Sequence, residues 1–524
     1  MFVKNHQRTL EERLPVLAQV DDYHKTVYTT WHMSYQQLSV NSRRLLCLMS
    51  FMHYTNIIEE IFQRSAIRLQ SYEPGIPATG SESEVRAYVT ECLKPYLDST
   101  DGWDSHAFRH AMADLLSYSL MNFDRANDAY TIHVLVHDWA STVVEHPVEV
   151  AREHTSLLLA ASIDYEDTMD SLTYKRVVEV HVTKLLYECA PPTPNNAALF
   201  SEVYYRAGKR EKELELDQIV MAGSKEKLGE EHGATLTSMH NVAEDLRQLG
   251  QYERALALQE QLLETQTRVS GLEDPETLKV MRAVASTYYD LGRYADAQSL
   301  HQHILDTSTR VHGHDHPDTL RSMHELACTY QVQGRYDQAE SLLLKVVDAR
   351  KRVSGDEHPE TLTSMDELAS TYYYQGRYDE AESMHEHVVE VRKRRQGDEH
   401  PDTLNTMGGL ALTYLAKGQY GEAEELGMKV LEAMKRVYGE GHPETLTSML
   451  NLASASYHQG RYEQAEELQK RVVEEREHVL GAGHPRRLIS MRNLLETYRV
   501  MGESRRREYD ALERQINELE SRAG

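Results

Sequence analysis

The sequence predicts an all-α protein, a right-handed α-solenoid of stacked helix pairs preceded by a small domain of another kind. Two observations predict this class. His-Pro pairs recur every 42 residues from His316-Pro317 to His484-Pro485. Leu, Met and Gly recur in the same register, with Leu and Met spaced as on one face of a helix. A fixed period in this range indicates supersecondary units that bury their apolar faces only by stacking on their neighbours.

The first helix of each unit is predicted from the His-Pro element onward. Pro suits the first turn of a helix, and the acid that follows it faces the positive end of the helix dipole. A repeated Leu and, three residues later, a repeated Met then form one apolar stripe. The methionines are Met239, Met281, Met323, Met365, Met407, Met449 and Met491.

A repeated glycine is expected to end each first helix, because glycine readily supplies the left-handed cap and the tight turn. A tyrosine follows two residues later and opens the second helix, whose repeated Ala allows close helix packing. Cations near the end of the second helix, such as Arg350-Lys351-Arg352, are expected to complement its dipole. The glycines are Gly250, Gly292, Gly334, Gly376, Gly418 and Gly460.

The unit HPxTLxxMxxLAxxYxxxGRYxxAExL resembles the tetratricopeptide repeat, lengthened from 34 to 42 residues. It is most similar to the repeats of kinesin light chains and of fungal and bacterial signalling proteins. The resemblance covers about residues 232–502, with a degenerate first repeat at 191–231. After Met501-Gly502 the pattern is lost, and a capping helix is expected at 503–524.

The first 140 residues follow another pattern. Apolar runs predict helices around Leu45-Leu46-Cys47-Leu48 and in AFRHAMADLLSYSLM, with residues 73–84 as a loop between them. A polar turn at Asp124 to Asp128 separates two short strand patterns and predicts a β-hairpin. Helices followed by a hairpin suggest a winged-helix-like domain over residues 1–140, then a helical connector over 141–190.

The string YTIHVLVHDW, together with TWHMSYQQL, resembles the end of the nucleotide-binding region of NB-ARC signalling ATPases, especially fungal NOD-like receptors. That resemblance places His133 at the family's phosphate-contacting histidine. However, the sequence has no GxxxxGK[ST] loop to hold nucleotide phosphates. We therefore expect His133 to be a partly buried residue of the winged helix, the chain to bind no cofactor, and residues 1–140 to be a remnant of such a region.

Composition restricts the partners. The formal charge of −26 argues against a general binder of nucleic acid or of anionic membranes. The four cysteines are scattered without a CxxC pair, which favours a reducing compartment and buried thiols. Without a secretion signal or an apolar segment of membrane-spanning length, the chain is expected to be cytoplasmic.

A peptide groove is expected on the concave side of the first helices, where residues next to the repeated Met vary while the core does not. The tetratricopeptide resemblance implies this offset. The predicted groove is basic at its start, acidic in the middle and apolar at its end, and Gly408-Gly409 should leave a pocket between their neighbours. Its residues are Lys279, Arg282, Arg321, Glu325, Asp366, Glu367, Tyr373, Leu412, Leu450, Asn451 and Tyr457.

Metal and catalytic sites are not expected. The histidines His301, His303, His312, His314 and His316 are interpreted as capping or turn residues, because a zinc site needs several ligands that converge. No Ser/His/Asp set or carboxylate pair stands out from the repeats. The chain is therefore predicted not to be an enzyme.

The predicted function is protein or peptide binding, as the sensor or scaffold module of a NOD-like signalling receptor whose repeats hold a partner or fold back on the winged helix. One alternative is a cargo adaptor like kinesin light chain, against which stands the lack of an N-terminal heptad region. Another is part of a nucleotide-binding ATPase whose P-loop lies outside this sequence.

Overall fold

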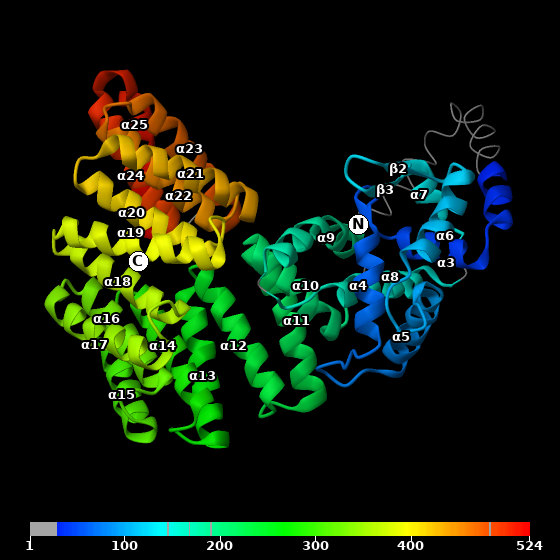
Figure 1. Ribbon diagram of the computed structural model, residues 1–524, viewed down its shortest axis with the longest axis horizontal. Coiled ribbons are helices and arrows are strands. Elements are labelled where there is room, and N and C mark those ends of the chain that lie inside the picture. Colours follow the sequence, from blue (N-terminus) through cyan, green and yellow to red (C-terminus); the bar gives the residue numbers. More distant parts are fainter. Residues whose placement is uncertain (1–28, 144–145, 167, 189–190, 481–483, 524) are drawn as a thin grey trace. The chain divides into compact units, whose positions relative to one another are not determined.

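The computed structural model describes residues 29–143, 146–166, 168–188, 191–480 and 484–523 of the 524-residue chain. They form two compact units (Figure 1). The first contains residues up to 166 and 174–203, and the second contains 167–173 and everything from Tyr204 onward.

The first unit is a helical domain with one small sheet. Residues 29–37 are helical. The helices and the 3-10 turn are α3 (Val40–Met49), α4 (Glu59–Leu69), α5 (Gly80–Leu93), η1 (Lys94–Tyr96), α6 (Ser105–Ser117), α7 (Val134–Ala140), α8 (Val148–Ser162), and most of α9 (Met169–Glu188) and of α10 (Pro194–Ala207). The strands are β1 (Ile57–Ile58), β2 (Met121–Asp124) and β3 (Ala129–Ile132).

The predicted hairpin is confirmed. Strands β2 and β3 pair antiparallel from Met121–Ile132 to Asp124–Ala129, and β1 adds to the other edge of β3 to give the order β1-β3-β2. The loop predicted at 73–84 is too long, because Thr79 caps α5. Its hydroxyl accepts from the Glu82 amide and the Glu82 carboxylate accepts from the Thr79 amide, so the helix begins at Gly80.

The second unit is a series of helix pairs. At its start α11 (Arg210–Leu228) packs on the first regular helix and leads into the regular pairs. The first helices are α12 (Gly233–Gln248), α14 (Pro275–Asp290), α16 (Pro317–Val332), α18 (Pro359–Tyr374), α20 (Pro401–Ala416), α22 (Pro443–His458) and α24 (Pro485–Met501). The second helices are α13 (Tyr252–Ser270), α15 (Tyr294–His312), α17 (Tyr336–Ser354), α19 (Tyr378–Gln396), α21 (Tyr420–Tyr438) and α23 (Tyr462–Leu480). Each packs on the next to give the predicted α-solenoid.

The N-termini of the first helices confirm that the histidine of the His-Pro element is a capping residue. Each histidine is the N-cap residue, and its Nδ1 accepts a hydrogen bond from the backbone N–H two residues later. In the pairs His316–Asp318, His358–Glu360, His400–Asp402 and His442–Glu444 the N···N distance is 3.2 to 3.3 Å. The imidazole therefore satisfies an amide that the helix leaves without a partner.

Glycine ends both helices of a pair. The predicted turn glycines, such as Gly376 with φ +77°, are left-handed, and so is a second set that the sequence analysis did not single out, such as Gly397 with φ +96°. Glycine adopts this conformation without the steric cost that a Cβ would bring.

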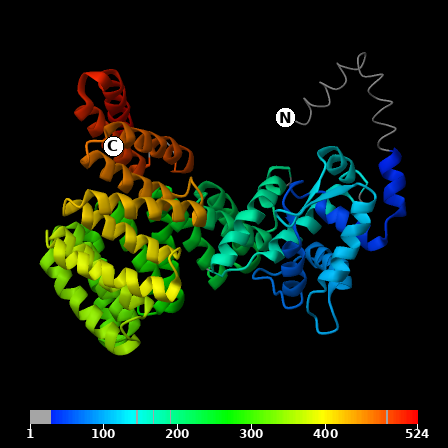
Figure 2. The ribbon, with the colours of Figure 1, turned by 45° about the horizontal axis from the view of Figure 1, so that its top comes forward.

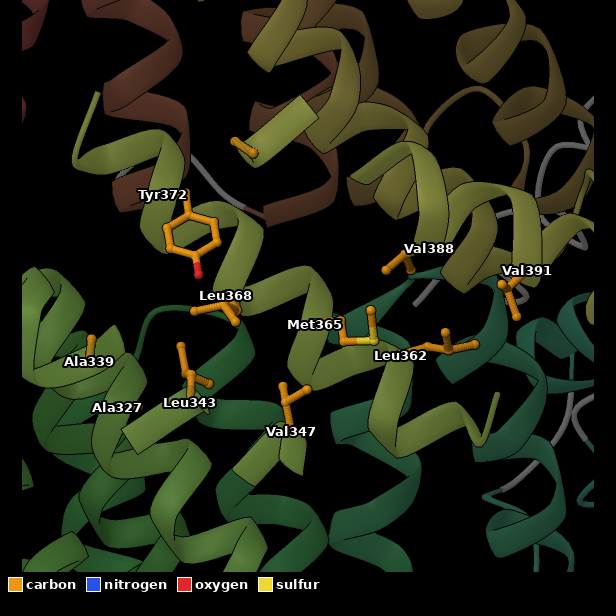
Figure 3. Packing of buried hydrophobic residues seen from close by; sticks show 11 residues of the cluster. Ala327, Ala339, Leu343, Val347, Leu362, Met365, Leu368, Tyr372, Val388 and Val391 are labelled. Carbon is orange, nitrogen blue, oxygen red and sulfur yellow. The ribbon is translucent and has the colours of Figure 1, made fainter. Parts of the chain in front are cut away.

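The core between repeats follows the predicted stripe. Around α18, Leu362, Met365 and Leu368 are 1 to 5% exposed and pack against Leu343 of α17 and Val388 of α19 (Figure 3). Each unit thus buries its apolar face only with the help of its neighbours.

The helices of the array wind through the second unit so that its early and late repeats meet (Figure 2). His484 Nε2 lies 3.1 Å from the carbonyl oxygen of Gln248, 236 residues earlier. Gly208 lies so close to α22 that an added Cβ would be 2.7 Å from Pro443 Cδ and 2.8 Å from His442 Cδ2. The array therefore closes on itself along these contacts.

Closure can be tested with one pair of glycines. Gly208 and Gly334 have nearly equal φ values, +68° and +72°, but nothing lies within 4 Å of a Cβ placed on Gly334. Gly334→Ala should cost about 1 kcal/mol through backbone strain alone. Gly208→Ala should cost at least about 1 kcal/mol more, because overpacking forces α22 away. Urea unfolding of both variants measures the difference, and equal losses would contradict the closure.

The last repeat is covered by η2 (Gly502–Arg505) and α25 (Arg506–Ala523). Leu512 and Ile516 of α25 pack on Met491, Leu494 and Tyr498, so one face of this polar helix shields the end of the array. No described helix combines the length and the apolarity needed to cross a membrane.

The cysteines follow the prediction in part. Cys47 and Cys92 are buried, whereas Cys328 is half-buried. Cys189 lies outside the described residues.

Candidate functional site

The predicted groove residues lie on the first helices of the array. We call the surface formed by the side chains that follow the repeated Met the A-helix face. Its residues at the two positions after each Met are His240, Asn241, Arg282, Ala283, His324, Glu325, Asp366, Glu367, Gly408, Gly409, Leu450, Asn451, Arg492 and Asn493.

Glu325 lies between titratable residues of two neighbouring helices. Its carboxylate lies 3.9 Å from Arg282 Nε on α14 and 3.8 Å from His301 Nδ1 on α15. Burial raises the pKa of Glu325 to about 7 against the opposing effect of Arg282, and lowers the pKa of His301 to about 4. This carboxylate is therefore only partly ionised near neutral pH.

Asp366 has a similar environment one repeat later. Its carboxylate lies 3.5 Å from Arg392 Nη1 and 3.6 Å from His385 Nε2, and it accepts a hydrogen bond from Thr406 Oγ1 at 3.2 Å. Burial raises the pKa of Asp366 to about 6 and that of Glu367 to about 7. The middle of the face is thus less negative at neutral pH than three adjacent acids suggest.

Buried arginines connect successive repeats, which the sequence analysis missed. Arg350, Arg392 and Arg476 occupy one repeat position near the end of the second helix. Each is 3 to 5% exposed and donates to a backbone carbonyl and a hydroxyl at the start of the next first helix. The exposed cations beside them lie in the last turn of the second helix, where they can complement its dipole. Arg350 and Arg392 are instead buried hydrogen-bond donors. The spacing of the three arginines by one and by two repeat lengths, with Met434 at the position between Arg392 and Arg476, was the available signal.

A second buried polar position recurs on the second helices. Gln259, His385 and Gln469 occupy it, and each is hydrogen-bonded to the threonine 28 residues later at 2.7 to 3.2 Å. These threonines are Thr287, Thr413 and Thr497. The bonds fix how each pair packs on the next.

The pocket predicted at Gly408-Gly409 is largely filled. A Cβ on Gly409 would lie 3.1 Å from Nε2 of His385, so the imidazole occupies the space that the missing side chain leaves. Asn451 Nδ2 lies 4.0 Å from a Cβ placed on Gly408. The prediction was wrong because it considered only the first helices.

The start of the predicted groove is open. Lys279 and Arg321 are exposed, and they form ion pairs with Glu276 at 3.6 Å and Glu360 at 3.8 Å. A hollow of about 240 Å³ lies between α12, α13 and α14, with Asn241 and Lys279 in its wall. The basic end therefore offers accessible charge and space.

The apolar end is engaged within the chain. Tyr373 and Tyr457 pack on Tyr378 and Tyr462, with ring centroids 5.8 and 5.5 Å apart. Leu450 packs against the core cluster of α22, whereas Leu412 is half-buried.

His133 does not have the predicted environment. It is exposed, not partly buried, and it is the N-cap of α7, with Nδ1 3.3 Å from the Leu135 amide nitrogen. The buried histidine of this segment is His137, whose Nε2 lies 2.8 Å from the carbonyl oxygen of Met52. The correction follows from α7, which begins at Val134 and so makes His133 a cap.

The first unit contains a cavity of about 650 Å³ beside α5 and α8. Asn195 and Asn196 in its wall are already bonded to the Ile76 backbone and to Ser156. We assign no ligand to it.

Comparisons with known proteins identify the repeats. One tetratricopeptide repeat model matches residues 276–351, 329–394, 365–436, 402–474 and 444–506, and a second matches 235–276. Residues 33–147 match a domain of unknown function, DUF7779. No curated protein matches the chain.

Solved structures show similar arrays. The nearly identical tetratricopeptide-like repeats of a Podosopora anserina protein assigned as a kinesin light chain are 32% identical, with 38% of this chain and 95% of that chain covered and a TM-score of 0.34. BtubC from P. vanneervenii is 18% identical over 45% and 92%, with a TM-score of 0.34. A signal transduction ATPase with a tetratricopeptide repeat sensor from Pyrococcus horikoshii is 14% identical over 93% and 63%, with a TM-score of 0.39.

At these TM-scores the structural likenesses carry no functional argument. The repeat matches and the helix pairs agree with each other. Residues 235–506 are therefore consecutive tetratricopeptide repeats that form a helical solenoid.

Proposed function

We propose that the A-helix face binds a segment of a partner protein, and that the chain is the sensor or scaffold module of a signalling receptor of the NOD-like type. An array of tetratricopeptide repeats is a scaffold suited to protein–protein interaction. The receptor assignment rests on the likeness of YTIHVLVHDW and TWHMSYQQL to NB-ARC proteins.

One observation carries the binding proposal. Arg282 Nη1, Glu325 Oε2 and Asp366 Oδ1 are buried atoms without a hydrogen-bond partner in the described part of the chain. They come from the variable positions of three successive first helices. Unsatisfied buried polar groups are costly, and a bound partner would offer hydrogen bonds to the carboxylates of Glu325 and Asp366, whose side chains remain partly exposed.

The neighbouring charges indicate the partner's chemistry. Glu325 and Asp366 would accept from amide or ammonium donors, while Arg282 and the exposed Arg321 would pair with carbonyl or carboxylate oxygens. We therefore propose an extended peptide segment with donors facing the middle of the array and an acidic group facing its start.

The proposal is tested with peptides selected from a displayed random library on the whole protein. The double variant Glu325→Gln, Asp366→Asn keeps the shape of both side chains and removes their charge. It should weaken peptide binding at least about tenfold in fluorescence anisotropy, in line with the loss of charged hydrogen bonds. Circular dichroism should show unchanged helix content.

The matched control is Glu390→Gln on the exposed side of α19. It removes one carboxylate away from the A-helix face and should leave affinity unchanged. Equal affinity of the double variant and the wild type would refute the assignment of the face. Equal weakening by Glu390→Gln would show that only the net charge of the protein matters, and would refute it as well.

A further inference from the structure

Three side chains with metal-binding atoms meet between α16 and α18. His324 and Cys328 lie one turn apart on α16, and Glu367 lies on α18. One ligand atom from each lies within 4.8 Å of the other two, and all three residues are half-buried. We infer that these residues form a binding site for a divalent transition metal ion of the zinc class.

The donor set fits such an ion. Zinc takes imidazole nitrogen, thiolate sulfur and carboxylate oxygen in a tetrahedral arrangement, and three protein ligands leave one position for water or another donor. Its bond lengths of about 2.0 to 2.3 Å place ligand atoms about 3.3 to 3.8 Å apart. Side-chain movements of about 1 Å would therefore close the site around an ion.

A second observation points to a ligand. His324 Nδ1 is buried and has no hydrogen-bond partner in the described structure. A metal ion held with Cys328 and Glu367 would give this imidazole the partner that it lacks. Gln331 Nε2 donates to the backbone carbonyl of Glu367 at 3.1 Å and so fixes the start of this side chain on α18. A coordinated thiol loses its proton, so the thiolate and the carboxylate would together balance a divalent charge.

Other pairs of successive first helices have equivalent positions, 42 or 84 residues from His324, Cys328 and Glu367. The three donor types do not occur together there. Between α14 and α16 the positions hold Arg282, Ser286 and Glu325, and between α18 and α20 they hold Asp366, Ser370 and Gly409. Between α20 and α22 they hold Gly408, Leu412 and Asn451. The repeat fold itself therefore does not require this combination, and the equivalent serines show that it tolerates Ser in place of Cys328.

A rival cluster of His312, His316 and Asp318 is better explained by capping. His316 Nδ1 already accepts from the Asp318 amide at 3.2 Å. The imidazoles of His312 and His316 stack with centroids 4.3 Å apart and planes inclined by 20°. Tyr438 and His442, at the equivalent positions of a later repeat, stack in the same way, with centroids 4.2 Å apart. Parallel stacked rings do not point their lone pairs at one common ion.

An ion bound by α16 and α18 would tie two successive repeats together. It would stabilise the folded array in proportion to occupancy, since the ligands are brought together only in the folded chain.

The test uses the whole protein, stripped of metal with a chelator under reducing conditions and titrated with Co²⁺. We expect one equivalent of Co²⁺ to give a thiolate-to-metal charge-transfer band that Zn²⁺ abolishes, and Zn²⁺ to raise Tm by several degrees. Cys328→Ser should remove the band, and His324→Gln and Glu367→Gln should each weaken binding at least about tenfold.

Cys92→Ser, which changes a buried thiol of the first unit, should keep the band. The absence of a band at saturating Co²⁺, or its persistence in Cys328→Ser, would overturn the assignment. His324 and Glu367 also belong to the A-helix face, but the Co²⁺ band is measured without peptide, so its presence or absence does not depend on the outcome of the peptide experiment.

Discussion

Met365→Asp should abolish the cooperative unfolding of the array near room temperature or lower its free energy of unfolding by about 3 to 5 kcal/mol. Met365 is 5% exposed and lies in the cluster that joins α17, α18 and α19. Aspartate would remove the methionine's apolar contacts. It would also place a charge in an apolar cluster that contains no cation to pair with it. Because each repeat is stabilised by its neighbours, the loss should uncouple the repeats on either side.

Leu344→Asp is the matched control. Leu344 lies mid-helix on α17, beside the fully buried Leu343, but it is 42% exposed. The same change in chemistry should cost there no more than about 1 kcal/mol. Urea unfolding followed by circular dichroism measures both variants. Similar midpoints would mean that the repeats are not joined through this cluster.

The array could be predicted because its information is local and repeated. The spacing of Leu362, Met365 and Leu368 fixes one helix face, and Gly376 fixes the end of that helix through its left-handed φ. His358 and Pro359 fix its beginning. Each of these signals acts within one helix, so a single sequence shows them.

The A-helix face could be predicted only in part, because its chemistry depends on pairs of helices. Arg282, Glu325 and Asp366 stand one or two residues after a repeated methionine, and this position identified them as neighbours of the core. It did not show that His385 fills the space at Gly409, which arises from packing of α19 against α20. Nor could residue type alone show that burial raises the pKa of Glu325 to about 7.

The contacts that close the array were also outside the reach of periodicity. His484 and Gln248 are 236 residues apart, and their meeting depends on the summed curvature of the intervening repeats. His133 shows the opposite error, in which a family resemblance outweighed a local signal. A histidine directly before VLVHDWA is an N-cap, as in the repeats.

Arg392→Met should lower the free energy of unfolding by about 3 kcal/mol. Arg392 is 3% exposed and donates to the Asp402 carbonyl at 2.8 Å and to Thr363 at 3.0 Å, with the Asp366 carboxylate at 3.5 Å. Methionine fills most of the same volume but leaves these acceptors without a donor. The loss of stability would therefore come mainly from the unpaired acceptors and only to a small extent from a cavity.

The chain itself contains the compensated form of this substitution. Met434 occupies the same repeat position as Arg392, and there the position of Asp366 is held by Gly408, so no carboxylate is left behind. The double variant Arg392→Met, Asp366→Asn should therefore recover about 1 kcal/mol, because the amide removes the uncompensated charge and can donate.

The exposed neighbour provides the control. Arg395→Met removes an ion pair with Glu357 at 3.2 Å in which both side chains are exposed, so it should cost no more than about 1 kcal/mol. If Arg392→Met cost as little as Arg395→Met, the buried guanidinium would be dispensable. If the double variant lost the sum of both single effects, Asp366 would not be coupled to Arg392, and the guanidinium would not oppose the rise that burial causes in the pKa of Asp366. The expected non-additivity instead makes the junction of α19 and α20 a place where stability and the charge of the A-helix face depend on the same two residues.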